Sequence, residues 1–227
     1  MVTAPAGPAR PPLNLLGDFA GGSMFLLTGV LAALVERAAS GQGQVVDAAI
    51  VDGVASLMAT NQGFIDLGVL PTGRGEGLLG GSAPNYRCYV CADGRELAVA
   101  AIEPQFLGRF LAALGLPVPE VSILDMGDDS EALRRLNADL AAIFATRPRD
   151  EWVAHFADID ACVAPVLTLA EASVHPYNVA RGVFLPAGDS FQPGVAPRFG
   201  RTPGVAGGAA GLDGSETLRQ WQATGYG

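Results

Sequence analysis

The chain has 227 residues and a net charge of −9, because fourteen basic side chains, all of them Arg, face twenty-three acidic ones. A chain with this acidic balance and without Lys is not a nonspecific nucleic-acid binder, a Schiff-base lysine enzyme or a P-loop nucleotide binder. Apolar residues make up 49% of the sequence, which predicts a folded protein of one or two domains rather than a disordered chain.

The cysteines and the N-terminus indicate a reducing compartment. Cys88, Cys91 and Cys162 are too few for a disulfide framework, and the first residues lack the pattern of a secretory signal. The uncharged stretch between Asp18 and Glu36 is short for a membrane span. We therefore expect a cytoplasmic protein without a membrane segment, in which this stretch forms a buried helix.

The first part of the chain reads as helical. Residues 1–12 are rich in Pro and Ala and predict a tail, and residues 20–39 predict an apolar helix that stops at Gly41. A short extended piece at 44–46 leads into an expected helix over 47–64, with Asp47 as its cap. The glycine-rich connection that follows, 68–84, marks a domain boundary or a functional loop.

From Asn85 the pattern changes to a small α+β unit. Two strands flank Asp93-Gly94, a strong hairpin signal. The remaining expected elements are helices at 104–114, at 130–145 (capped by Asp129 or Ser130) and from Pro148, a buried strand within 162–169, and a last helix at 215–222. The expected domains are a tail (1–12), a helical part with its linker (13–84), a small α+β domain (85–168) and an irregular C-terminal segment (169–227).

Three sequence features resemble functional motifs, but their surroundings do not favour a functional site. The sequence 75–80 matches GxGxxG but lacks the strand before it and the helix after it that a dinucleotide site needs. Cys88 and Cys91 fall on a predicted strand, where positions three apart face opposite sides, so we expect no metal site. His155 and His175 are expected to be surface or core-edge side chains.

Two carboxylates leave alternatives open. Asp18 lies before the glycine pair Gly21-Gly22 at a helix start, where it is either a first-turn acid or a proton-transferring or nucleophilic group beside glycines that admit a substrate. Glu103 follows an apolar strand and precedes Pro104. It is either a helix-start acid or part of a site at the end of that strand.

The chain resembles family III CoA-transferases, also called the CaiB/BaiF family, and within it the 2-methylacyl-CoA racemases. The matching stretches run from residue 11 to about residue 204. The most specific are PPLNLLGDFAGGSMFLLTGVLAAL and LGGSAPNYRCYVCADGRELAVAAIEPQF, and the others include DACVAPV, HPYNVARGVF and APRFGRTPG.

The resemblance implies an α/β (mixed α+β) fold, with part of a Rossmann-like large domain, mostly its helices, and a small α+β domain, in interlocked homodimers. It implies an acyl-CoA thioester substrate, in which coenzyme A belongs to the substrate, and no other cofactor. In the racemases, an Asp and a His move the α-proton through an enolate, and Asp18 matches this Asp. Glu103 matches a glutamate that supports the catalytic His. Substrate-binding positions are expected at the glycine pairs Gly21-Gly22 and Gly80-Gly81.

About the first third of the family pattern, which carries the catalytic His and most contacts to coenzyme A, does not match any part of this chain. We therefore expect little racemase activity from the chain alone, and an exposed apolar surface where the absent sheet packs. The N-terminal third is then supplied by a homodimer or a partner chain. Two alternatives remain: a family III CoA-transferase with Asp18 as nucleophile, and a non-catalytic half of a split or decayed enzyme.

Overall fold

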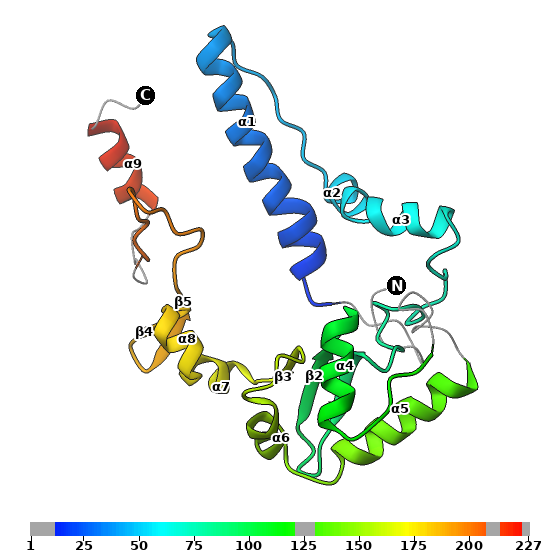
Figure 1. Cartoon of the computed structure of the whole chain (residues 1–227). Coiled ribbons are helices and arrows are strands. Elements are labelled where there is room, and N and C mark those ends of the chain that lie inside the picture. Colours follow the sequence, from blue (N-terminus) through cyan, green and yellow to red (C-terminus); the bar gives the residue numbers. More distant parts are fainter. Residues whose placement is uncertain (1–11, 121–129, 208–213, 224–227) are drawn as a thin grey trace. The chain divides into compact units, whose positions relative to one another are not determined.

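The computed structural model describes residues 12–120, 130–207 and 214–223 (Figure 1). The chain divides into two compact units, Met1–Val166 and Leu167–Gly227. The first unit contains η1 (Leu15–Ser23), α1 (Met24–Ser40), α2 (Ile50–Leu57), α3 (Ala59–Asp66), β1 (Tyr86–Val90), β2 (Glu96–Ala100), α4 (Pro104–Ala113), α5 (Glu131–Phe144), α6 (Arg149–Phe156) and β3 (Val163–Pro165). The second unit contains α7 (Leu169–Val174), α8 (Pro176–Arg181), β4 (Phe184–Ala187), β5 (Ser190–Pro193) and α9 (Gly214–Ala223).

The first helical segment opens with a π-helical turn. The N–H of Phe19 donates to the carbonyl of Asn14, and the N–H of Met24 donates to that of Phe19, so both bonds reach five residues back instead of four. The helix therefore begins earlier than expected. It ends at Gly41, whose φ of 76° lies in the left-handed region that favours glycine, as the sequence predicts.

The prediction that this helix is buried is wrong. None of the residues of α1 is buried, and Val35 is 74% exposed. The continuous helical segment Leu15–Ser40 has a mean hydropathy of 1.7, so by length and composition it is able to cross a membrane, a property that core helices of soluble proteins share. An apolar surface is exposed on α1, as expected, and its packing against an absent sheet stays a prediction. An apolar composition predicts that burial of a helix is favourable, but it does not predict that segments of the same chain bury it.

The helix expected over 47–64 is two helices. Helix α2 begins after Ala49, and α3 follows α2 directly after Met58. Asp47 does not cap α2, because the residue at the N-cap position is Ala49. Residues 42–49 form no regular secondary structure, so the backbone turns into the helix two residues later than the Asp47 signal predicts.

The region expected as a small α+β domain contains an antiparallel sheet with strand order β1-β2-β3, and it lies in the same compact unit as the helical segment before it, so its boundary at residue 85 stays a prediction. Tyr86 pairs with Ala100 at one end of the hairpin, and Val90 pairs with Glu96 at the other. The turn at Asp93-Gly94 forms as expected: Gly94 has a φ of 76°, and the N–H of Arg95 donates to the Asp93 carboxylate at 3.2 Å.

Helices α4, α5 and α6 build the core of this domain with the sheet. Phe144 lies at its centre, with ring centroids 4.9 Å from Tyr89 and 5.2 Å from Trp152. Phe110 stacks on Phe144 from α4, and Leu97 of β2 is fully buried against them. Ser130 caps α5 by accepting a hydrogen bond from the N–H of Leu133, which settles the choice between the two expected caps.

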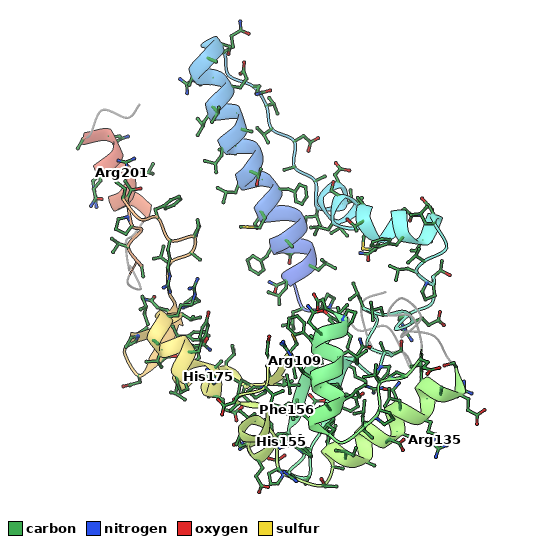
Figure 2. All side chains as sticks on the ribbon, in the orientation of Figure 1. Arg109, Arg135, His155, Phe156, His175 and Arg201 are labelled. Carbon is green, nitrogen blue, oxygen red and sulfur yellow. The ribbon has the colours of Figure 1, made fainter. Side chains whose placement is uncertain are left out.

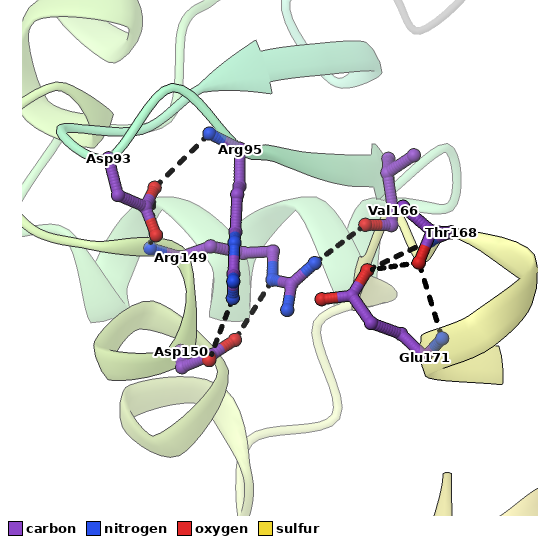
Figure 3. A network of polar contacts seen from close by, with 7 residues as sticks. All are labelled: Asp93, Arg95, Arg149, Asp150, Val166, Thr168 and Glu171. Carbon is purple, nitrogen blue, oxygen red and sulfur yellow. Dashed lines mark hydrogen bonds and ion pairs between the residues drawn. The ribbon is translucent and has the colours of Figure 1, made fainter. Parts of the chain in front are cut away.

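A buried arginine ties the hairpin turn to the end of β3. Arg149 is only 4% exposed; its Nε donates to Asp150 and its Nη1 to the carbonyl of Val166, both at 2.9 Å (Figure 3). The N–H of Arg149 also donates to Asp93 at 3.3 Å. These hydrogen bonds join the hairpin turn, the start of α6 and the end of β3, which assigns Arg149 a structural role.

The prediction of an almost irregular C-terminal segment is wrong. The second unit contains helices α7 and α8 and a two-stranded sheet of β4 and β5 before α9. Thr168 and Glu171 form a reciprocal capping box at the start of α7. These elements are only four to six residues long, so they carry too little periodicity for the sequence to reveal them.

Candidate functional site

Asp18 lies in the π-helical turn η1 with its side chain exposed. Within the described part of the chain, its carboxylate has no hydrogen-bond or ion-pair partner, and the Ser23 hydroxyl donates to the main-chain carbonyl of Asp18 at 2.9 Å. The main chain at Asp18 is held in place while the carboxylate stays open to the solvent. Single π-helical turns often occur at functional sites, so this geometry is compatible with either reactive role.

The pair Gly21-Gly22 follows on the same turn and is buried against α2. A Cβ added to Gly21 would lie 2.6 Å from a methyl carbon of Val54, and one added to Gly53 would collide with the carbonyl of Gly21. A Cβ on Gly22 would lie 3.1 Å from Ile50. These glycines permit a close helix approach that fixes the backbone beside Asp18, and their contact with a substrate remains a prediction.

The second glycine pair lies in the connection between α3 and β1. Gly81 has a φ of 86°, and a Cβ on Gly80 would collide with the carbonyl of Glu76, so the chain turns too tightly there for a side chain. Gly80 also lines a cavity of about 300 Å³ whose other lining residues are Met58, Asn61, Leu70, Pro71, Glu76 and Leu79. The cavity is mostly apolar with two polar side chains, a composition that suits part of an organic ligand.

Asn137 fixes this connection to the small domain, and sequence analysis missed it. Its Nδ2 donates to the carbonyl of Ser82 at 2.8 Å, and its Oδ1 accepts from Arg87 at 3.1 Å and from the Tyr89 hydroxyl at 3.3 Å. The single hydrogen of the Tyr89 hydroxyl is shared with the carbonyl of Pro84, which lies closer at 2.6 Å, and burial raises the pKa of Tyr89 far above its ordinary value. An Asn in an amphipathic helix gives no sign that it will receive these partners.

Asn85 joins the end of the connection to the end of β2. Its side chain is fully buried and donates to the carbonyl of Ala101 at 2.9 Å, while the N–H of Ala101 donates back to the carbonyl of Asn85 at 2.9 Å. Glu103 is two residues further on. The structure therefore places the segment that follows Gly80-Gly81 beside the strand end that presents Glu103.

Glu103 is the N-cap residue of α4, where it is exposed and its side chain makes no capping bond. Its carboxylate has no hydrogen-bond or ion-pair partner among the described residues. It lies near Cys162: desolvation first, and then the charges of Asp160 and Glu103, raise the pKa of that thiol. Glu103 is thus available to a ligand or to another chain.

The two histidines belong to different units, His155 to the first and His175 to the second. Figure 2 shows His155 on α6, next to Phe156, and His175 at the junction of α7 and α8. His155 packs edge-on against Trp152 and Phe156, and its Nε2 lies 3.0 Å from the carbonyl of Ala113. It is a core-edge side chain, as the sequence predicts.

No group of three metal-capable side chains occurs among the residues that the structure describes. Cys88 is exposed and Cys91 is buried, so the CxxC side chains face different environments on β1 and just after it. In both thiols the pKa is raised, mainly by desolvation, which keeps them protonated.

Comparison with known proteins identifies the same family over most of the chain. The sequence model of CoA-transferase family III matches residues 1–213. The chain is 41% identical over 196 residues to an alpha-methylacyl-CoA racemase of Mus musculus, a match that covers 86% of this chain and 51% of the racemase. It is 29% identical over 212 residues to a succinyl-CoA–D-citramalate CoA-transferase of Chloroflexus aurantiacus, covering 87% of this chain and 51% of the transferase.

A solved structure supports the fold. The crystal structure of a CaiB/BaiF family protein from Brucella suis matches with a TM-score of 0.70 at 19% identity, and the match covers 96% of this chain and 57% of that one. The chain spans about half the length of the curated relatives it matches. The matched residues, the fold and the identity to a racemase agree, and the chain belongs to CoA-transferase family III.

Proposed function

We propose that the protein carrying this chain is an isomerase that racemises 2-methylacyl-CoA thioesters by removing and returning the α-proton. The observation that carries this proposal is the 41% identity to an alpha-methylacyl-CoA racemase over 86% of the chain. Identity to the CoA-transferase is lower, at 29% over a similar share. Coenzyme A enters as part of the substrate, and the chemistry needs no further cofactor because the thioester itself acidifies the α-carbon.

Asp18 is the acid/base of this chain in the proposed reaction. Its carboxylate is exposed and unpaired among the described residues, so it can accept a proton, while η1 and α2 hold its backbone rigidly. A positioned carboxylate of this kind contributes about 10²–10⁴-fold to a proton transfer. The base that acts on the opposite face of the α-carbon, a histidine in the racemases, is not assigned to His155 or His175.

Glu103 and the Gly80 cavity complete the proposed site. Glu103 acts as a positioning carboxylate for the second base, because it is exposed at the start of α4 and has no competing partner among the described residues. The cavity lined by Gly80, Leu70 and Leu79 takes an apolar part of the acyl-CoA. The bound thioester needs oriented hydrogen bonds for its enolate oxygen, and the N–H groups of glycine-rich turns provide such donors.

The test is deuterium incorporation at the α-carbon of 2-methyloctanoyl-CoA in D₂O, followed by mass spectrometry. We expect little exchange from the pure chain. The DNA upstream of the Met1 codon shows whether the reading frame continues, and the longer product should then exchange rapidly. In that product Asp18→Asn should slow exchange by about 10²-fold or more, whereas the control Asp47→Asn should not. Rapid exchange by the longer product carrying Asp18→Asn would contradict the role of Asp18.

A CoA-transferase is the second candidate, favoured by the match to the Chloroflexus aurantiacus enzyme. In this reaction the Asp18 carboxylate attacks the thioester carbonyl, the thiolate of coenzyme A leaves, and a mixed anhydride forms on Asp18. Trapping of an acyl or CoA adduct on Asp18, seen as a mass increase of the peptide that contains it, selects the transferase. α-Exchange without an adduct selects the racemase.

A role in assembly is the third candidate, and the uncovered helix α1 favours it. In this case the chain is one half of a split enzyme, or a decayed one, and it pairs with a second copy or with a chain that carries the remaining sheet. Co-purification with such a chain supports the split enzyme. A stable homodimer without α-exchange supports lost function.

A further inference from the structure

The C-terminal unit contains a cavity of about 450 Å³ that has no part in the proposed racemisation. Two arginines, Arg181 and Arg198, line it, and the rest of its lining consists of glycine, proline and aliphatic residues from 182–206. No acidic side chain is among the lining residues. The cavity is therefore a positively charged hollow in a chain whose net charge is −9.

Close backbone packing shapes this cavity. The N–H of Gly194 donates to the carbonyl of Val183 at 2.7 Å, and a Cβ on Gly194 would collide with the carbonyl of Gly182. A Cβ on Gly204 would lie 2.7 Å from a methyl carbon of Val195. The segments after α8, after β5 and before residue 207 thus meet around the cavity.

The two guanidinium groups are placed differently. The Nη2 of Arg198 donates to the carbonyl of Gly182 at 2.7 Å, which orients that side chain and uses one of its five N–H donors. Arg181 ends α8, just before Gly182 turns the chain at a φ of 61°. Within the described residues, Arg181 has no hydrogen-bond or ion-pair partner.

Among the described residues of the β4–β5 hairpin and the cavity lining, Asp189 is the only acid, and it lies away from the two charges. Asp189 lies in the turn of the β4–β5 hairpin, next to the Ala187–Ser190 pair, whereas the cavity lies beyond the open end at Phe184–Pro193. Three residue steps along a strand separate these pairs, or about 10 Å. Solvent and salt screen a carboxylate at that distance from exposed guanidinium groups.

We propose that Arg181 and Arg198 form a binding site for a phosphate group. A phosphate monoester carries a charge of about −1.5 to −2 at pH 7, which two guanidinium groups balance. Their planar N–H forks match the phosphate oxygens, and one fork is already oriented by the Gly182 carbonyl. The phosphate comes from a CoA ester or from free inorganic phosphate. This proposal does not depend on the racemase proposal, because no step at the α-carbon involves the cavity.

Isothermal titration calorimetry on the full chain tests the proposal, with coenzyme A, dephospho-coenzyme A, inorganic phosphate and acetate as probes. Arg181→Gln is the main variant because it removes no described contact. Arg198→Lys retains a charge but loses the fork. Arg201→Gln is the matched control: this arginine is exposed in the same unit (Figure 2) but does not line the cavity.

We expect the phosphate-bearing probes to bind more tightly than acetate, and binding to weaken with added salt. Arg181→Gln should weaken binding at least about tenfold, Arg198→Lys less, and Arg201→Gln less than about twofold. Tighter binding of coenzyme A than of dephospho-coenzyme A identifies the 3′-phosphate as the recognised group. Equal affinity for coenzyme A and inorganic phosphate identifies free phosphate. Absence of binding, or equal losses in Arg181→Gln and Arg201→Gln, overturns the proposal.

Discussion

The helical segment at 15–66 and the small domain at 85–166 contain similar apolar side chains but differ in how far those side chains are buried. In the small domain Phe110, Leu97 and Phe144 are fully buried. In α1 no residue is buried, and leucines such as Leu31 are about half exposed. The small domain has three helices that pack on its sheet, whereas α1 contacts mainly the adjoining η1 and, at Gly29, the side chain of Val46 from the segment 42–49. The difference shows that an apolar sequence indicates which side chains favour burial, while the topology determines whether other parts of the same chain bury them.

The largest expected effect comes from truncating a side chain in each region. Phe144→Ala should lower the free energy of unfolding of the small domain by about 3–5 kcal/mol, because it leaves a cavity between Tyr89, Phe110 and Trp152. In the monomer, at concentrations below those of self-association, Leu31→Ala should change it by less than about 0.5 kcal/mol, because that side chain is about half exposed there. Urea unfolding followed by tryptophan fluorescence measures both. A comparable loss in Leu31→Ala would show that α1 is covered in solution.

Self-association of the chain is the next expected effect. Leu27 and Leu31 lie one helical turn apart on α1 and are both about half exposed. Replacing both by Gln should raise the concentration at which the chain associates by about tenfold or more, since burying one Leu contributes about 1.5–3 kcal/mol. Light scattering after size exclusion measures the change, with the isolated exposed Leu169→Gln as control. An unchanged profile would assign association to another surface.

The hydrogen bonds of Asn137, which hold the glycine-rich connection 68–84 to the small domain, are expected to have a smaller effect on stability. Asn137→Ala should cost about 1–3 kcal/mol in the free energy of unfolding, because the carbonyl of Ser82 and the side chains of Arg87 and Tyr89 lose their shared partner. It should also increase hydrogen exchange of the connection around Gly80. The control Asn61→Ala should leave stability nearly unchanged, since Asn61 has only a weak contact with Met58 sulfur at 4.0 Å. Unaltered exchange near Gly80 would mean that the connection is held by other contacts.

The smallest expected effect is a pH dependence of the hairpin turn. Desolvation tends to raise the pKa of Asp93, but hydrogen bonds from the N–H groups of Arg95 and Arg149 and the charge of Arg95 outweigh it and lower the pKa. A lowered pKa in the folded state contributes stability above the carboxyl group's ordinary pKa, and this stability is lost as the pH falls through the folded value.

Asp93→Asn isolates this contribution because Asn-Gly keeps the same turn preference. Thermal unfolding between pH 7 and pH 3 should show a slightly smaller acid destabilisation in the variant than in the wild type. Asp150→Asn is a useful second variant, since Asp150 pairs with Arg95 and Arg149 at an exposed position. If Asp93→Asn left the pH profile unaltered, the turn would contribute no titrating stability.

The sequence by itself determined the elements whose signals are local. The Asp93-Gly94 hairpin, the stop of α1 at Gly41 and the Pro104 start of α4 follow from the dihedral and hydrogen-bonding preferences of single residues. The family resemblance also came from the sequence, and it predicts roles for Asp18 and Glu103.

Features that depend on contacts between residues distant in sequence are determined only by the tertiary structure. In the structure the expected 47–64 helix forms two helices, and short helices and strands form after residue 168. The side chains of α1 are not buried. The tertiary structure also gave Asn137 its three partners and paired Asn85 with Ala101. Burial and long-range hydrogen bonding depend on which surfaces of the fold meet, and the identity of a single side chain does not specify those surfaces. The sequence therefore predicts the apolar helix but not its environment.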